Sequence, residues 1–269
     1  MLSYVAISSL WRRFSKLIPS QQDLLDVISS EPPGRDKMVA TKRIKTYIRG
    51  LDEHLQGGIP LGHTVLIAGK PGTMKSSVAY NVLYHNAKEE NKSGVYVTLE
   101  QSRDSVVDSM AGLGMELDGI DERLSVLDLS MIRKKLKQLS KQSWIEVFKM
   151  YVNNLKGSMD VDLLVLDSLP VLQVMAKFED PRDDLFRFFE WLRELGITSF
   201  LIAEMDQDGN KFCAHGEDFL SDGIMHLDLR RDDRVVNLFL SIVKMRKTAH
   251  KRGYFPLIFD EGGFEVVTH

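Results

Sequence analysis

Residues 69–76 read Gly69-Lys70-Pro71-Gly72-Thr73-Met74-Lys75-Ser76. The apolar run HTVLIA at residues 63–68 precedes them and predicts a buried strand, and residues 76–89 have helical spacing. A glycine-rich turn between a strand and a helix lets backbone N–H groups wrap a phosphate, assisted by the positive end of the helix dipole. Lys75 is placed to reach the β- and γ-phosphates, and Ser76, followed by Ser77, offers a hydroxyl to Mg²⁺. The stretch predicts a triphosphate site; the alternative is a connector that happens to contain Gly, Pro and Lys.

The loop departs from the pattern GxxxxGK[ST] at Met74, where the pattern has glycine. Because a Cβ atom strains a left-handed backbone, we expect Met74 to have a near-helical backbone. We also expect its side chain to point away from the phosphates. Gly72, two residues earlier, keeps some of the loop's freedom.

Short apolar runs alternate with helical stretches along the rest of the chain. Further strands are expected at residues 94–99, 124–127, 161–166 and 197–203, and further helices at 102–113, 130–156 and 183–195. This alternation predicts an α/β fold with a mainly parallel sheet flanked by helices. Residues 223–229, 235–245 and 254–259 are separated by turns alone and predict antiparallel strands that extend the sheet at one edge.

Two acidic residues follow predicted strands. Asp167 ends the run at 161–166, and the carboxyl end of a buried parallel strand is the ligand edge of such a sheet, so Asp167 is the expected partner of Mg²⁺. The alternative is an N-cap or turn residue near Pro170. Glu100 ends the strand at 94–99, which we place next to the strand before the loop. It could take a proton from the attacking water or orient it; the alternative is an exposed acid at a strand end.

Two cations lie two residues apart on a predicted C-terminal strand. Lys244 and Arg246 therefore point to the same face, where they repel each other unless an anion lies between them. His250 and Arg252 follow shortly afterwards, near a turn. The alternative is a charged strand that discourages edge-to-edge pairing.

Several stretches together resemble the RecA-like P-loop ATPases, and within them the KaiC-like branch. The matching stretches are Gly50-Leu51-Asp52-Glu53, Gly57-Gly58-Ile59-Pro60-Leu61-Gly62, the loop at 69–76, Val97-Thr98-Leu99-Glu100, Leu166-Asp167-Ser168, residues 185–198, Ser221-Asp222-Gly223-Ile224 and Lys244-Met245-Arg246 through Thr248, His250 and Gly253. The resemblance divides the chain into an N-terminal helix and connector at 1–43 and one KaiC-like RecA-type ATPase domain at 44–269.

The resemblance implies a slow Mg²⁺-dependent ATPase, assembled as a hexamer or filament with ATP at the subunit interfaces and acting as a nucleotide-dependent switch. Lys244 and Arg246 match the pair that touches the γ-phosphate of the neighbour's ATP, and His250 and Arg252 match positions near that nucleotide. A regulatory protein partner is also implied. The two-domain clock protein has phosphorylated hydroxyls in its second domain, so neither a circadian role nor autokinase activity is carried over to this chain.

The composition of the chain excludes several other classes of protein. Hydrophobic residues make up 43% and charged residues 27% of the chain, which excludes a mostly disordered chain. The net charge of −3 gives no global attraction to nucleic acid or anionic lipid. The single cysteine, Cys213, cannot form an internal disulfide, so we expect a cytoplasmic protein. No apolar run reaches the roughly 18 residues of a membrane span, and residues 3–17 predict a short N-terminal helix.

Two other functions remain open. A DNA-binding recombinase relative or recombination mediator is suggested by a basic stretch with Trp144 after it, although such runs are more often a solvated helix face. Its residues are Arg133, Lys134, Lys135, Lys137 and Lys141. A nucleotide sensor without catalysis is suggested by Met74 and by Gln101, which stands where KaiC-like proteins usually have a second glutamate.

Overall fold

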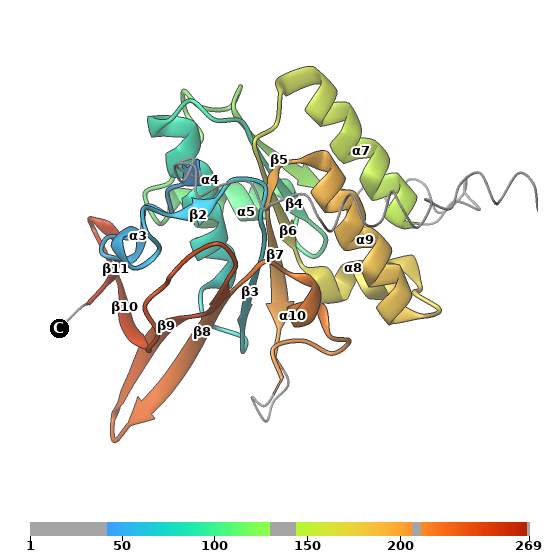
Figure 1. Ribbon diagram of the computed structural model, residues 1–269. Helices are drawn as coiled ribbons and strands as arrows, with labels where there is room; N and C mark the ends of the chain where they lie inside the picture. Colours follow the sequence, from blue (N-terminus) through green and yellow to red (C-terminus); the bar gives the residue numbers. More distant parts are fainter. Residues whose placement is uncertain (1–41, 130–143, 206–210, 268–269) are drawn as a thin grey trace, which may run out of the picture. The chain divides into compact units, whose positions relative to one another are not determined.

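The structure, a computed structural model, describes residues 42–129, 144–205 and 211–267 (Figure 1). The expected helix at 3–17, the connector as far as residue 41, and the start of the expected helix at 130–156 lie outside these residues. So does the basic stretch at 133–141, from Arg133 to Lys141. None of the described helices is both long enough and apolar enough to cross a membrane.

The described residues form one mixed sheet of nine strands in the order β11-β10-β9-β8-β3-β7-β6-β4-β5, with a separate antiparallel pair, β1 and β2. The strands are β1 (Arg43–Ile44), β2 (Ile59–Pro60), β3 (Thr64–Gly69), β4 (Gly94–Thr98), β5 (Leu124–Asp128), β6 (Leu163–Asp167), β7 (Thr198–Glu204), β8 (Gly223–Asp232), β9 (Val235–Met245), β10 (Phe255–Asp260) and β11 (Gly263–Val266). The helices are α3 (Leu51–His54), α4 (Lys75–Glu89), α5 (Arg103–Ala111), α7 (Trp144–Met159), α8 (Leu169–Ala176), α9 (Pro181–Leu195) and α10 (Glu217–Leu220).

The mainly parallel sheet is confirmed. Strands β3, β4, β5, β6 and β7 pair in parallel, and β9, β10 and β11 continue as an antiparallel edge. The first C-terminal strand, β8, differs from the expectation in one respect: it is antiparallel to β9 but parallel to β3. It therefore joins the two halves of the sheet.

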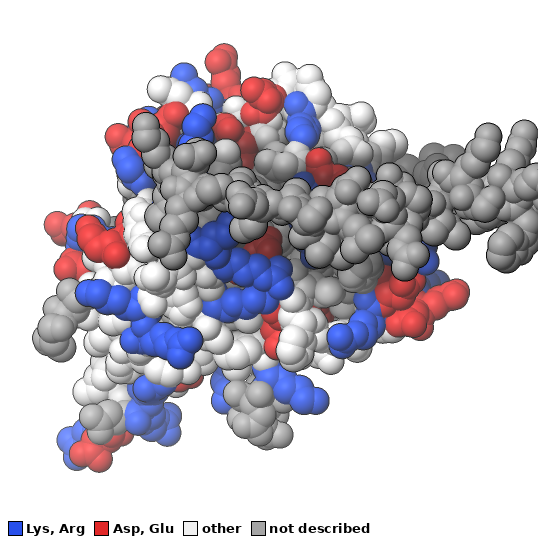
Figure 2. Space-filling model, in the orientation of Figure 1, with Lys and Arg blue, Asp and Glu red and all other residues white. Residues whose placement is uncertain are grey.

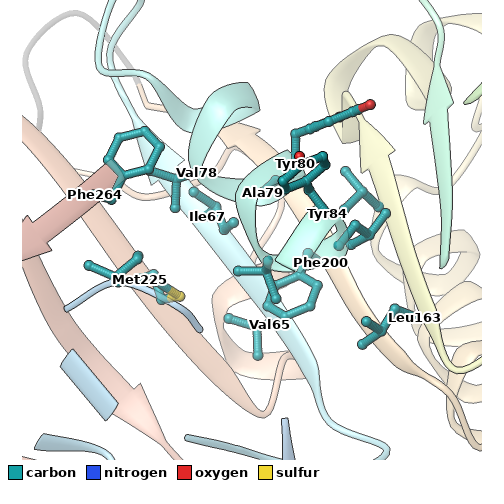
Figure 3. Packing of buried hydrophobic residues seen from close by; sticks show 14 of the residues in the cluster. Val65, Ile67, Val78, Ala79, Tyr80, Tyr84, Leu163, Phe200, Met225 and Phe264 are labelled. Atoms are coloured by element: carbon teal, nitrogen blue, oxygen red, sulfur yellow. The ribbon is translucent and has the colours of Figure 1, made fainter. Parts of the chain in front are cut away.

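Each face of the sheet is covered by its own hydrophobic cluster. On one face, side chains of α3, α4 and α5 pack against β3, β4 and β6; Figure 3 shows Val78 of α4 beside Ile67 of β3. On the other face, α7, α8 and α9 cover the alternate residues of the same strands. Strands buried on both sides must be apolar throughout, which explains the continuous apolar runs in the sequence.

Local signals fix several helix ends. The Ser102 hydroxyl accepts a hydrogen bond from Ser105 N at the start of α5, and the Asp180 carboxylate accepts from the amides at the start of α9. Gly196 ends α9 in the left-handed conformation, with φ of 68°. The parallel pairing of β3 with β7, and of β7 with β6, brings the carboxyl ends of these three strands to the same edge of the sheet.

Candidate functional site

The loop between β3 and α4 is held by contacts within the fold. The buried Thr73 hydroxyl donates to the Lys70 carbonyl at 2.8 Å. A Cβ atom on Gly69 would lie 2.4 Å from the carbonyl oxygen of Leu227 in β8, so no other residue fits there without a shift. Gly72 has φ of 82°, a conformation that also favours glycine. The first turn of α4 contains no acidic residue that would offset the positive end of the helix dipole.

Met74 has φ of 60° and ψ of 26°, in the left-handed region, so the expectation of a near-helical backbone is wrong. The residue is the N-cap of α4, and its carbonyl accepts the first helical hydrogen bond from Val78 N at 2.9 Å. A non-glycine residue in this conformation costs about 1 kcal/mol. The side chain is partly buried against the core under α4, which offsets that cost.

Lys75 lies inside the loop at the start of α4. Its Nζ donates to the carbonyl of Gly69 at 3.0 Å and to that of Lys70 at 2.9 Å. Burial lowers the pKa of Lys75, while the charges of Glu204, Asp167 and Glu100 act in the opposite direction. The ammonium is thus held by weak neutral acceptors in the middle of three carboxylates, a position from which it can turn to a phosphate.

Ser76 and Asp167 meet at the carboxyl end of the sheet, although 91 positions separate them in the chain. The Ser76 hydroxyl donates to Oδ2 of Asp167 at 2.8 Å. The same oxygen accepts a hydrogen bond from the hydroxyl of Tyr96 in β4. The Mg²⁺ site expected from the sequence therefore consists of two side chains that lie in contact.

This donor set fits Mg²⁺. A hydroxyl and a carboxylate are hard oxygen ligands, and Mg²⁺ is usually bound through one or two such groups together with substrate phosphates and water. Among the described residues, no group of three or more His, Cys, Asp or Glu side chains could hold a metal elsewhere. The oxygen atoms of Ser76 and Asp167 thus have the chemistry needed to hold such an ion.

Glu100 lies on the other side of Asp167 from the loop. We expected Glu100 to follow a strand next to β3. This expectation is wrong, because β7 and β6 lie between β3 and β4. The end of β4 is instead beside the end of β6, and Oε1 of the exposed Glu100 accepts a hydrogen bond from the Ser168 hydroxyl at 2.9 Å. The backbone N–H of the neighbouring Gln101 donates to the Thr98 hydroxyl at 3.1 Å, within the turn that follows β4.

The C-terminal cations lie at the opposite end of the sheet. Lys244 pairs with Ile224 of β8, which pairs in turn with Leu66, near the start of β3. The segment between α10 and β8 is fixed to the same end, because Asp222 N donates to the Thr64 carbonyl at 2.8 Å. Within one chain, therefore, the structure does not bring Lys244 and Arg246 to the loop that follows β3.

Both cations are bound to their own chain. Lys244 Nζ donates to the carbonyls of Ser221 at 2.6 Å and Asp218 at 2.9 Å, and burial lowers its pKa. Arg246 forms an ion pair with Asp222 at 2.8 Å and also donates to the Phe219 carbonyl at 3.3 Å. The two side chains share one face, as the spacing predicted, and both point to the end of α10.

His250 and Arg252 belong to the connection between β9 and β10. Nδ1 of His250 lies 3.4 Å from the Lys251 carbonyl, and Arg252 is exposed. Figure 2 shows that Lys and Arg side chains gather on the face of the molecule over this connection. The face is thus positively charged, although the chain as a whole has a net charge of −3.

Sequence reasoning missed three residues of the carboxyl-end site. Glu204 ends β7, and Gly69 pairs with it in register. The pattern that singled out Asp167, an acid after an apolar strand, would have found it. Ser168 directly follows Asp167, but nothing in the sequence connects it to Glu100. Tyr96 lies inside a strand, where an aromatic residue is ordinary, so no local signal marks it.

Comparisons with known proteins show the family and the fold. A family model described as "ATPase: KaiC" matches residues 44–269. The circadian clock oscillator protein KaiC of Rippkaea orientalis is 29% identical over 232 residues, which cover 84% of this chain and 44% of that protein. The circadian clock protein KaiC2 of Synechocystis sp. is 27% identical over 224 residues, covering 82% of this chain and 39% of that protein. The chain thus spans less than half the length of the curated relatives it matches.

A solved structure is also similar. The KaiC-like protein PH0186 from the hyperthermophilic archaeon Pyrococcus horikoshii OT3 has a TM-score of 0.73 and 27% identity to this chain. The match covers 85% of this chain and all of that one.

Proposed function

This chain belongs to the KaiC ATPase family, and on that premise we propose that it binds ATP with Mg²⁺ and hydrolyses it slowly. The family makes it a nucleotide-binding, KaiC-like protein with a RecA-like fold. We further propose that ATP lies at the interface between copies of the chain, in a hexamer or filament, and that its hydrolysis switches assembly or the binding of a regulatory partner. We place the protein in the cytoplasm, where its single cysteine stays reduced.

One observation supports ATP binding above the others. The Ser76 hydroxyl and the Asp167 carboxylate are in contact at 2.8 Å, directly after a glycine-rich loop that opens α4. A structural turn would need neither residue. A metal–phosphate site needs both, because the hydroxyl can bind the ion and the carboxylate can accept hydrogen bonds from the ion's ligands.

The residues divide the reaction between them. Lys75 leaves the carbonyls of Gly69 and Lys70 to bind the β- and γ-phosphates, while the first amides of α4 donate to phosphate oxygens. Mg²⁺, held at Ser76 and Asp167, would neutralise charge on the phosphates. Glu100 accepts a proton from the attacking water, and the Ser168 hydroxyl orients its carboxylate.

The positive charge that completes the site comes from a second copy in this proposal. Lys244 and Arg246 lie at the far end of the sheet from their own loop, so they can meet a γ-phosphate only across an interface. His250 and Arg252 follow in the connection after β9, and Arg252 is exposed there. ATP binding would then draw the two cations from the end of α10 to the neighbour's phosphate, and assembly and hydrolysis would depend on each other.

The decisive experiment is a titration with Mg²⁺-ATP in equilibrium dialysis. We expect Lys75→Ala to weaken binding by at least about 100-fold, the size expected when one partner of a partly buried, hydrogen-bonded charge pair is removed, because the phosphates then lose their cation. Lys88→Ala is the matched control, because Lys88 lies at the far end of the same helix, where its Nζ donates to the Tyr84 hydroxyl at 3.3 Å and lies over the Tyr84 ring. Wild-type affinity in Lys75→Ala would remove the phosphate assignment.

The second arm measures the mass of the assembly. Light scattering with and without Mg²⁺-ATP should show a larger particle when nucleotide is present. A mass that does not change would leave ATP binding intact but contradict an interfacial site.

A further inference from the structure

The hydroxyl of Tyr96 reaches the metal-site carboxylate along one face of the sheet. Tyr96 of β4 pairs in register with Val165 of β6, and Asp167 is two residues further along β6, on the same face. The Tyr96 hydroxyl donates to Oδ2 of Asp167, the oxygen that also accepts from Ser76. Oδ1 of Asp167 accepts no hydrogen bond from the residues that the structure describes.

Tyr96 is completely buried, and its hydroxyl donates to Asp167 and also interacts with the Ser76 hydroxyl. Its ring lies 5.5 Å from the ring of Tyr80, centroid to centroid, within the cluster under α4. Burial, and then the negative charge of Asp167, raise the pKa of Tyr96 well above its ordinary value. A carboxylate oxygen can only accept, so in this contact the phenol hydroxyl is the donor.

We propose that Tyr96 is a positioning residue for Mg²⁺: its buried hydroxyl fixes the Asp167 carboxylate so that Oδ1 remains available to the metal and its water. The inference rests on the proposed Mg²⁺-ATP binding and adds a residue that no motif contains. Two donors on Oδ2, from α4 and from β4, hold the carboxylate in one orientation. A carboxylate held by one donor can rotate, so binding of the ion then costs the entropy of ordering the carboxylate.

The test is the variant Tyr96→Phe, which removes one oxygen and keeps the packing ring. The readout is the fluorescence of ATP labelled with an N-methylanthraniloyl group, titrated with Mg²⁺ at fixed nucleotide and protein. We expect the half-saturating Mg²⁺ concentration to rise about 10-fold, the lower end of the range for the loss of a group that supports a metal ligand. Binding of the labelled ATP in EDTA should stay at the wild-type value.

Tyr80→Phe is the matched control. Tyr80 is equally buried and belongs to the same cluster, but its hydroxyl has no hydrogen-bond partner among the described residues. Its removal should leave the Mg²⁺ titration unchanged. Thermal melts of both variants establish that each is folded before it is titrated.

The outcomes separate this inference from the proposed function. A wild-type Mg²⁺ midpoint in Tyr96→Phe overturns the positioning role and leaves Mg²⁺-ATP binding in place. Equal weakening with Mg²⁺ and in EDTA also overturns it, because the loss is then general. A wild-type protein that binds labelled ATP with no Mg²⁺ dependence contradicts the metal site of the proposed function itself.

Discussion

The charged residues near the two ends of β3 differ in how they are held. At the carboxyl end, Lys75, Ser76 and Asp167 converge from two elements, and each is held by contacts that a triphosphate and its metal can replace or extend. At the amino end, Lys244 and Arg246 are already paired with carbonyls at the end of α10 and with Asp222. The phosphate loop and the metal-site side chains of the first site all come from one chain, whereas the cations of the second site are bound to groups of their own chain and are far from that loop. On the proposed function, only an anion from another copy competes for these cations.

The largest expected effect concerns the cations near the amino end of β3. Arg246→Ala should lower the ATPase rate about 10³-fold, the lower end of the range for a cation that stabilises phosphoryl transfer from a neighbouring subunit. ATP affinity should change much less, since the loop is intact. The measurement is steady-state phosphate release at saturating Mg²⁺-ATP. Arg187→Ala is the control, because it breaks a surface ion pair of similar geometry, 3.0 Å to Asp183, on α9.

Mixing sharpens this result. Lys75→Ala and Arg246→Ala subunits, each inactive alone, should recover about a quarter of the wild-type rate when mixed in equal amounts, since a head-to-tail interface then combines one intact loop with one intact arginine. If no activity is recovered, both residues act within one chain, and the proposed division of the site between two copies is wrong.

The next effect concerns the carboxyl end. Glu100→Gln keeps the shape and the hydrogen bond from Ser168 but cannot accept a proton, so single-turnover hydrolysis should fall at least about 10²-fold. Binding of ATP should be unchanged. Equal rates in the variant and the wild type would favour the nucleotide sensor without catalysis, for which Met74 and Gln101 are the departures from the family pattern.

The smallest effect concerns the backbone of the loop. At Met74, glycine relieves the left-handed strain but loses the packed side chain, whereas alanine loses the side chain and keeps the strain. We therefore expect Met74→Gly to be more stable than Met74→Ala by about 1 kcal/mol, against the usual order of helix propensities. Urea unfolding of both variants measures this difference. A more stable Met74→Ala would mean that the loop carries no strain at this residue.

Local patterns were sufficient for part of this architecture. The loop and the position of Asp167 follow from residues that are neighbours in the chain, and the apolar runs predict each central strand to within two residues at either end. The pairing order does not follow from such patterns, because the central parallel strands β3, β4, β6 and β7 are buried on both faces and have the same apolar appearance. Glu100 was therefore assigned to the wrong neighbour.

Other features depended on tertiary contacts. Helix α8 went unpredicted, since its residues LPVLQVMA are apolar all round and show no helical periodicity; Pro170 in its first turn suggested only a cap or a turn. The conformation of Met74 is stabilised by packing that lies outside the loop. The hydrogen bond from Tyr96 to Asp167 requires β4 and β6 to be adjacent, a fact that neither strand encodes alone.

The contact between β8 and the first glycine of the loop has a mechanical consequence. The carbonyl of Leu227 leaves no room beside Gly69, and Leu227 is paired with Leu240 of β9, the strand that runs back to Lys244. The β8–β9 pair therefore contacts the phosphate loop at Leu227, near the middle of β8, and carries Lys244 close to the end of β9. On the proposed function, a neighbouring copy that moved the Lys244 end of this strand pair would act on the phosphate loop through Leu227, with no separate lid or hinge.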